Sequence, residues 1–147
     1  VVMRISLVLG FPVAGGNSFF ANLYAKLKDN KTVTAPTYEV RTPVDVATLS
    51  ECVLELCTNR YAGILHVGAT DSINRYELTR ILARRMGFDD QLVQAQTRPD
   101  ATPGRAPRHK NAIIRVDKAL AILKTPLLST QGGIDRAFET RPASFPL

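Results

Sequence analysis

The run from Gly63 to Phe88, GILHVGATDSINRYELTRILARRMGF, constrains the fold of this chain more than any other stretch. It begins with a short apolar segment at residues 64–67, continues through a turn at Gly68 and ends in a longer amphipathic stretch. Asn74 followed three residues later by Glu77 is the pattern of a capping box, in which side chains satisfy free amides of the first helical turn. A strand, a loop and a capped helix in this order predict an α/β protein.

The stretch after the cap has the residue spacing of a helix with one apolar face. The residues that share this face are Leu78, Ile81, Leu82 and Met86. The arginines that fall away from it are Arg80, Arg84 and Arg85. The spacing therefore predicts a helix that packs on one side against a core.

Similar alternation predicts strands and helices along the rest of the chain. Residues 2–9 are apolar almost without interruption, which predicts a buried parallel strand covered by helices on both faces. Two further β segments are expected at residues 32–37 and 112–116, and residues 96–110 are expected to form a long loop because they are rich in proline and glycine. No internal repeat is visible.

Three further helices are predicted from caps and apolar stripes. The first is capped by Asn17 or Ser18 and has an apolar face of Phe19, Phe20, Leu23, Tyr24 and Leu27. The second opens at Pro43 and Asp45 and has a stripe of Val46, Leu49, Val53, Leu56 and Cys57. Towards the end of the chain, Asp117 is expected to cap a helix that ends at Leu123, and Ser129 or Thr130 to begin a last helix that ends at Phe138.

Length and charge set the broad class of the protein. A chain of 147 residues is the size of one domain, here expected at residues 1–140 with a tail at residues 141–147. The net charge of +6 can attract nucleic acid, an anionic membrane or a phosphorylated small molecule, and does not choose among them. Cys52 and Cys57, with only two histidines in the chain, show no metal-ligand spacing, so reduced structural thiols are expected.

Candidate binding residues are all of the kind that contacts anions. The turn at Gly15, Gly16 and Asn17 precedes a predicted helix, whose free amides can hold an anion, although a plain cap without a ligand explains the same residues. The loop residues Arg105, Arg108, His109 and Lys110 suit phosphate oxygens or simply form a solvated basic loop. Arg41 lies beside a predicted helix start and is open to the same two interpretations.

The residues by themselves show no reaction. The chain has no G-x-G-x-x-G fingerprint, and the glycines at residues 10–16 lack the Lys-Ser/Thr of a phosphate-binding loop. No Ser-His-Asp arrangement can be argued from two isolated histidines.

Four segments in order resemble one family. They are MRISLVLG, RTPVDVATLSECVLEL, the run from Gly63 to Phe88, and APRHKNAIIRVDKALAIL. Together they are similar to the C-terminal half of an extended short-chain dehydrogenase/reductase of the dTDP-4-dehydrorhamnose reductase type, a group that includes the non-catalytic regulatory subunit of methionine adenosyltransferase. The resemblance covers residues 2–136. It implies the C-terminal part of a Rossmann-like NAD(P)-binding fold with its substrate-binding region, without the N-terminal cofactor half.

The resemblance assigns expected roles to six residues. Ile5 and Ser6 would lie beside the nicotinamide end of NADP or NAD. Asn17, Arg41, Arg105 and Arg108 would contact a nucleotide-sugar-like anion. Ile5 and Leu7 depart from the family, because the reductases have polar and aromatic residues there.

The family's glycine-rich loop and its catalytic Tyr-x-x-x-Lys pair lie upstream of the segments that this chain resembles. The resemblance therefore implies that the chain is not catalytic by itself and binds NADP or NAD only with a companion N-terminal half. A strand at residues 2–9 without its neighbours would have open edges. A companion polypeptide, self-association or a rearranged fold is expected to cover them.

Three functions follow as hypotheses. The first is the substrate-binding portion of an NAD(P)-dependent nucleotide-sugar reductase. The second is a non-catalytic regulatory or structural subunit derived from that family, which the residues at Ile5 and Leu7 favour. The third is a basic nucleic-acid-binding module. Two observations argue against it: the arginines are not interleaved with aromatic residues, and no nucleic-acid-binding motif is present. No nucleic acid or membrane partner is expected, and the expected location is the cytoplasm or an organelle interior.

Overall fold

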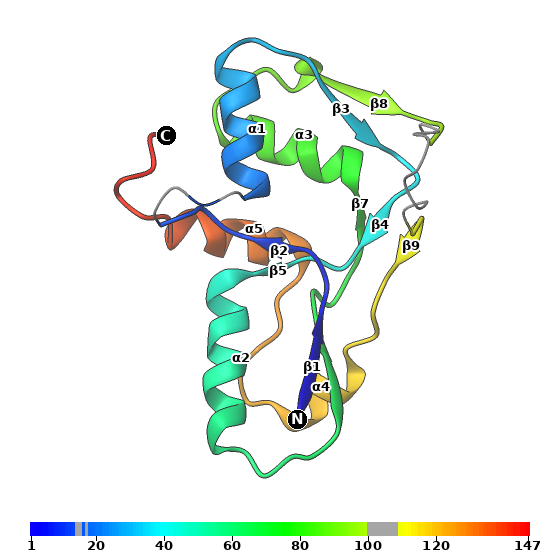
Figure 1. Cartoon of the computed structure of the whole chain (residues 1–147), viewed down its shortest axis with the longest axis vertical. Coiled ribbons are helices and arrows are strands. Elements are labelled where there is room, and N and C mark those ends of the chain that lie inside the picture. Colours follow the sequence, from blue (N-terminus) through cyan, green and yellow to red (C-terminus); the bar gives the residue numbers. More distant parts are fainter. Residues whose placement is uncertain (14–15, 17, 100–108) are drawn as a thin grey trace.

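The computed structural model of the chain describes residues 1–13, 16, 18–99 and 109–147, and forms two lobes (Figure 1). The first lobe, at the top of Figure 1, contains α1 (Phe19–Lys28), β3 (Val33–Pro36), α3 (Arg75–Arg85), the 3-10 helix η1 (Asp90–Leu92) and β8 (Val93–Gln96). The second lobe, at the bottom, contains β1 (Val2–Ile5), α2 (Val46–Thr58), β6 (Ile64–Val67) and α4 (Asp117–Ile122). The last helix, α5 (Thr130–Glu139), lies between the lobes.

Most strand pairs are parallel and join segments that are far apart in the sequence. In the second lobe β1 runs parallel to β6, with Val2 opposite Ile64 and Ile5 opposite Val67. In the first lobe β3 runs parallel to β8. Between the lobes β2 (Val8–Leu9) runs parallel to β5 (Val44–Asp45), and β4 (Val40–Arg41) pairs with β7 (Ile73–Asn74) and with β9 (Asn111–Ala112). Parallel strands connected through helices confirm the predicted α/β class.

The predicted single buried strand at residues 2–9 is wrong in two respects. The chain breaks into β1 and β2 because it leaves β6 after Ile5 and crosses to β5, where the Val44 amide donates to the Leu7 carbonyl oxygen at 2.9 Å. The strand β1 is also largely exposed, with Val2 at 58% and Ile5 at 47%. Among the described residues β1 pairs only with β6, so its other edge is open, as the sequence predicted.

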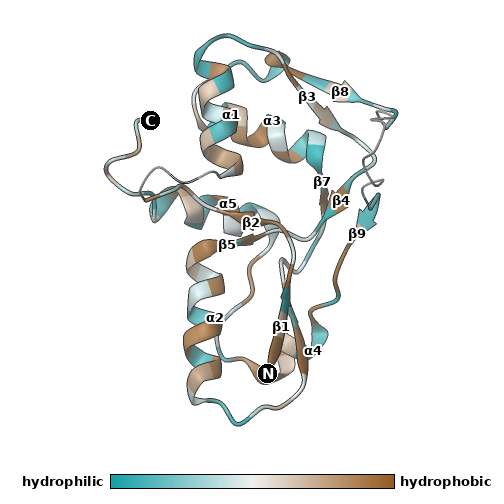
Figure 2. Ribbon diagram, in the orientation of Figure 1, coloured by the Kyte–Doolittle hydropathy of each residue, from teal (hydrophilic) through white to brown (hydrophobic). Residues whose placement is uncertain are grey.

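Each lobe has its own hydrophobic core. The core of the first lobe includes Phe20, Leu23, Leu78 and Leu82, and extends to Ile134 of α5. The core of the second lobe is formed by side chains from α2, β6 and α4, including Cys52, Leu56, Leu65, Val67 and Ala119. Figure 2 shows the hydrophobic strand β2 near α5 and the hydrophilic strand β9 at the edge of the molecule.

Four predicted helix starts are confirmed by cap hydrogen bonds. Ser18 caps α1, Asp45 caps α2, Asn74 caps α3 and Ser129 caps α5, each accepting from a backbone amide three residues later. The fifth is wrong: Val116, not Asp117, is the cap residue of α4 and makes no side-chain cap bond, and the Asp117 carboxylate accepts from Arg115 Nε at 3.0 Å. The predicted strand at residues 112–116 is reduced to Asn111–Ala112.

The buried face of α2 differs from the predicted apolar stripe. The helix buries Thr48, Cys52 and Leu56, whereas Val46 and Val53 are 43% and 44% exposed. The face is set by polar contacts at the helix start, where Asp45 is 1% exposed and Thr48 accepts a hydrogen bond from Arg136. An apolar pattern alone cannot reveal a face that is selected by buried polar groups.

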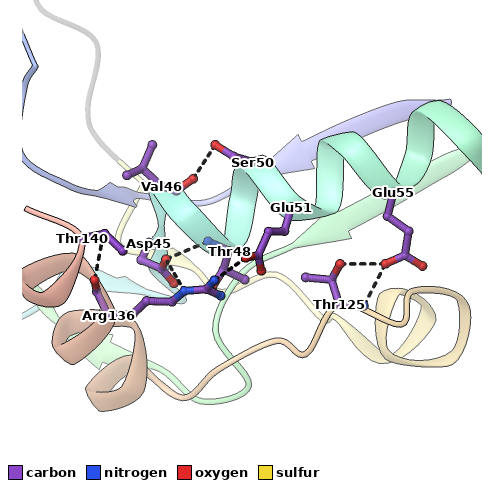
Figure 3. Close-up of polar contacts among 9 residues, drawn as sticks. All are labelled: Asp45, Val46, Thr48, Ser50, Glu51, Glu55, Thr125, Arg136 and Thr140. Carbon is purple, nitrogen blue, oxygen red and sulfur yellow. Dashed lines mark hydrogen bonds and ion pairs between the residues drawn. The ribbon is translucent and has the colours of Figure 1, made fainter.

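Arg136 and Glu55 hold the parts of the fold together (Figure 3). Arg136 reaches from α5 to the first turns of α2, where it donates to Thr48 Oγ1 at 3.0 Å and to Glu51 and lies 4.0 Å from Asp45 Oδ1. The Glu55 carboxylate accepts from the backbone amides of residues 124 and 125 at 2.7 and 2.8 Å. Charge-assisted bonds of this kind are stronger than neutral ones, so they fix α2 against α5 and the segment after α4.

The C-terminal segment contributes to the first core. Residues 141–147 form no helix or strand, but the Phe145 ring lies 4.7 Å from the Phe11 ring and 5.3 Å from the Tyr24 ring, measured between centroids. The division into a domain at residues 1–140 and a tail stays a prediction. The ring contacts of Phe145 join the C-terminal segment to the core of the first lobe.

Candidate functional site

The carboxyl ends of β1 and β6 form the most informative edge of the molecule. Because the two strands are parallel, Ile5 and Val67 end them side by side, followed by Ser6 and Gly68. Ligands of open α/β sheets bind in the crevice outside the carboxyl ends of the strands. This edge is therefore the candidate functional site.

Thr42 links the segments that meet at this edge. Its amide donates to Ser6 Oγ at 3.3 Å, and its carbonyl oxygen accepts from the Ala69 amide at 3.3 Å. Its hydroxyl oxygen accepts from the Ile114 amide at 3.4 Å. Thr42 is 3% exposed, so these bonds form in a buried place and fix the ends of both strands to residue 114.

Gly68 allows this close approach. A Cβ atom at Gly68 would lie 2.8 Å from the Thr42 carbonyl oxygen and 3.1 Å from Thr42 Oγ1. Both distances are shorter than a normal carbon–oxygen contact, so a side chain would force the two backbones apart. The turn glycine predicted from the sequence is required here for packing.

A cleft with a volume of about 260 Å³ opens beside Thr42. Its polar lining residues are Thr42, Thr70, Asp71, Ser72, Arg115 and Asp117, together with apolar side chains from residues 113–120. Asp71 Oδ1 accepts from the amide and the hydroxyl of Thr130 at 2.7 and 2.6 Å, which holds the start of α5 against the cleft. The hydroxyl groups and carboxylates that line the cleft can form hydrogen bonds with a ligand that carries hydroxyl groups.

The structure brings Ile5 and Ser6 to the edge of the candidate site. Ile5 is 47% exposed at the end of β1, and Ser6 is half-buried and bonded to Thr42. Their predicted contact with a nicotinamide stays a prediction.

Arg41 is occupied by contacts within the protein. One of its terminal nitrogens donates to the carbonyl oxygens of Val40 and Lys110 at 2.8 and 3.4 Å. The other donates to Glu39 Oε2 and to the His109 carbonyl oxygen, both at 3.1 Å. The Arg41 side chain is 15% exposed, so its main role in this structure is to hold residues 109 and 110 against β4. Contact of Arg41 with a substrate stays a prediction.

The other three predicted substrate-binding residues, Asn17, Arg105 and Arg108, lie outside the described residues. His109 and Lys110, the last residues of the predicted basic loop, are exposed.

Sequence reasoning missed Thr42 and Asp71 at the site. Each is a single polar residue beside a strand or turn, and only the hydrogen bonds across the fold single them out.

Tyr24 and Lys28 of α1 have the spacing Tyr-x-x-x-Lys, although the catalytic pair of the family is expected upstream of the segments that this chain resembles. The Tyr24 ring packs against Phe88 and Phe145 at centroid distances of 5.6 and 5.3 Å. The pair belongs to the first lobe, whereas Ile5 lies in the second. Its surroundings indicate a packing role for Tyr24.

The two thiols differ. Cys52 is a buried free thiol, as expected, and burial raises its pKa to about 11. Cys57 is also free but is exposed on α2, so its expected structural role stays a prediction. In the described part of the chain no three His, Cys, Asp or Glu side chains come together as a metal site, and no helix is long and apolar enough to cross a membrane.

Solved structures of reductases resemble this fold. The dTDP-4-dehydrorhamnose reductase from Bacillus anthracis in complex with NADP superposes with a TM-score of 0.78 at 20% identity, over 93% of this chain and 47% of that chain. The corresponding reductase from Clostridium acetobutylicum gives 0.79 at 18% identity, over 93% and 47%. A hypothetical dTDP-4-dehydrorhamnose reductase from Sulfolobus tokodaii gives 0.69 at 26% identity, over 86% and 43%. The chain therefore spans about half the length of these reductases.

The sequence comparisons identify the family. The chain has no significant match among curated proteins. The profile of the RmlD substrate-binding domain matches residues 1–141, nearly the whole chain. The similarity to extended short-chain reductases expected from the four sequence segments is confirmed, and this chain belongs to the RmlD substrate-binding domain family.

Proposed function

We propose that this chain is the substrate-binding portion of an NAD(P)-dependent nucleotide-sugar reductase of the dTDP-4-dehydrorhamnose reductase type. The match of residues 1–141 to the RmlD substrate-binding domain is the observation that carries the proposal. The similarity of the fold to about half of such a reductase supports it.

The proposed fold is the C-terminal part of a Rossmann-like domain. Its strands β1 and β6 would be the last strands of a larger parallel sheet. The open edge of β1 and the exposed side chains of Val2 and Ile5 support this, because a strand edge of this kind requires a neighbour. We propose that a companion N-terminal segment, or failing that a second copy of the chain, pairs with this edge.

The cofactor would be held mainly by the companion segment. NADP or NAD supplies hydride chemistry when it is bound, and the related reductase structure from Bacillus anthracis contains NADP. The chain has no G-x-G-x-x-G loop for the pyrophosphate. The apolar side chain of Ile5 and the hydroxyl of Ser6, at the carboxyl end of β1, fit contact with the nicotinamide end alone.

The substrate would bind at the candidate site, with its phosphates held by residues that precede β9 in the sequence. The cleft beside Thr42 offers hydroxyl groups for a sugar, and Asn17, Arg105 and Arg108 would bind the phosphates. We propose that Arg41 acts indirectly, because its bonds to the carbonyl oxygens of residues 109 and 110 hold the end of the arginine-bearing segment against β4.

The test is reconstitution with a polypeptide that carries a glycine-rich loop and an upstream Tyr-x-x-x-Lys pair. NADPH binding, followed by fluorescence, and NADPH oxidation with a dTDP-4-dehydro sugar are expected only in the complex. Ile5→Glu is expected to weaken NADPH binding at least about tenfold, since it places a charge beside the nicotinamide. Val53→Glu changes an equally exposed side chain on α2 and is the matched control. Equal NADPH affinity of both variants would refute the placement of Ile5.

A non-catalytic subunit of the same family is the second candidate. The aliphatic residues Ile5 and Leu7 favour it, because the resemblance implies polar and aromatic residues there. A reconstituted complex that binds NADPH but oxidises it with no sugar nucleotide would support the second candidate over the first.

A further inference from the structure

A group of basic side chains lies on the face of β1 and β6 that points away from the core of the second lobe. Arg4 and His66 are directly opposite each other in the parallel register. Side chains alternate between the two faces of a strand, and the core contains the neighbours Met3, Leu65 and Val67. Arg4 and His66 therefore leave the sheet together on the other face, on strands about 5 Å apart.

Two further basic side chains close this face from the side. Arg115 precedes α4 and Lys118 lies in it, and both line a pocket with Arg4, Ile64 and His66 that has a volume of about 260 Å³. Lys118 Nζ lies 5.9 Å from the centre of the Tyr61 ring. The Tyr61 hydroxyl donates to the Ile64 carbonyl oxygen at 3.0 Å, so the ring that contacts Lys118 is tied to β6.

The charges of the pocket are unbalanced. Arg4, Arg115 and Lys118 carry three permanent positive charges, and the nearby carboxylate of Asp117 is already bonded to Arg115 Nε at 3.0 Å. Like charges gathered in a concave site repel one another, and an anion bound among them relieves this repulsion. Guanidinium groups present planar donor pairs that match phosphate oxygens. A pocket of this size accepts one or two phosphoryl groups.

We propose that the pocket formed by Arg4, His66, Arg115 and Lys118 binds a phosphate-bearing small molecule. It is separate from the candidate site at the carboxyl edge, although Arg115 lines both the pocket and the cleft. The proposal does not depend on the reductase function, since Arg4 and Lys118 do not line that cleft.

The test is calorimetric titration of inorganic pyrophosphate into the protein that carries this chain. The double variant Arg4→Gln/Lys118→Gln removes two cations from the pocket. The matched control Lys26→Gln/Arg60→Gln removes two exposed cations elsewhere, on α1 and after α2. Charged hydrogen bonds to phosphate are strong, so the pocket variant is expected to bind at least about tenfold more weakly, with the control within about twofold of the parent.

Two further arms make the result decisive. Thymidine diphosphate is titrated into the parent protein and the pocket variant in parallel, and only binding that the pocket variant loses is assigned to this pocket. If that binding is tighter than the binding of pyrophosphate, a nucleotide is the source of the phosphate; if it is equal or weaker, the free anion is the source. The charge-keeping variant Arg4→Lys/Lys118→Arg is expected to retain binding, which separates loss of charge from loss of folding. Absence of pyrophosphate binding in the parent protein, or an equal loss in the pocket variant and the control, would overturn the proposal.

Discussion

Replacement of Gly68 by alanine tests the construction of the candidate site. The new Cβ would lie 2.8 Å from the Thr42 carbonyl oxygen and 3.3 Å from Ile114 Cδ1. The nearest obstacle is backbone, so it cannot rotate away. To relieve this clash, the end of β6 and the segment that leads into β5 must move apart by about half an ångström. This movement weakens the hydrogen bonds that Thr42 makes to Ala69 and Ile114.

The magnitude follows from two opposing effects. Overpacking of this kind costs about 1–3 kcal/mol. The loss of glycine freedom in the unfolded chain returns about 0.4–1 kcal/mol. Because the 2.8 Å contact is with backbone, the overpacking cost lies in the upper half of its range, about 2–3 kcal/mol. The net loss is then about 1–2.6 kcal/mol, which corresponds to a fall in melting temperature of roughly 2–10 °C for a chain of this size.

Gly132→Ala in α5 is the matched control with the opposite sign. The new Cβ would lie 3.4 Å from Leu128 Cβ, which is an ordinary contact. Residue 132 is also part of a helix, where alanine is favoured over glycine by about 0.5–1 kcal/mol. Urea unfolding of both variants, followed by circular dichroism, measures the difference. A Gly68→Ala protein as stable as the parent would refute the close approach of Gly68 to Thr42.

Three other perturbations test the wider fold. Arg136→Met leaves the Asp45 carboxylate, which is 1% exposed, without its nearby cation. The variant is expected to lower the unfolding free energy measured in urea by about 1.5–3 kcal/mol. A loss below about 0.5 kcal/mol would contradict the role of Arg136 in fixing α5 against α2. Bonds from two backbone amides lower the pKa of Glu55, so its stabilising effect is complete above the ordinary glutamate pKa and is lost as the pH falls through the lowered value. Glu55→Gln is therefore expected to destabilise the protein at neutral pH and to approach the parent below about pH 4 in thermal melts, and a difference that is the same at both pH values would count against this. Because burial raises the pKa of Cys52 to about 11, iodoacetamide at pH 8 is expected to label Cys57 first, as peptide mass spectrometry can show; early labelling of Cys52 would mean that α2 opens.

The order of strands and helices was accessible from the sequence because it depends on local signals. Ser18, Asp45, Asn74 and Ser129 each cap the helix that follows, and a cap acts within three residues of its own position. The family was accessible for the same reason, since its motifs are short runs of neighbouring residues.

The buried face of α2 and the break between β1 and β2 were not accessible. Thr48 is buried because Arg136, 88 residues further along the chain, donates a hydrogen bond to it. The break after Ile5 reflects the crossing of the chain from β6 to β5. Both depend on partners that are distant in sequence, to which local patterns are insensitive.

The candidate site divides in the same way. The sequence by itself determined that Gly68 follows a strand and that Ile5 and Ser6 lie in an extended segment, because strand and turn residues act locally. Only the tertiary structure decided that Thr42 joins the two ends, that Arg41 bonds inward to residues 109 and 110, and that Arg4 faces His66. Hydrogen bonds and charge clusters form between segments that the fold brings together, and their free energy depends on the burial that the fold supplies.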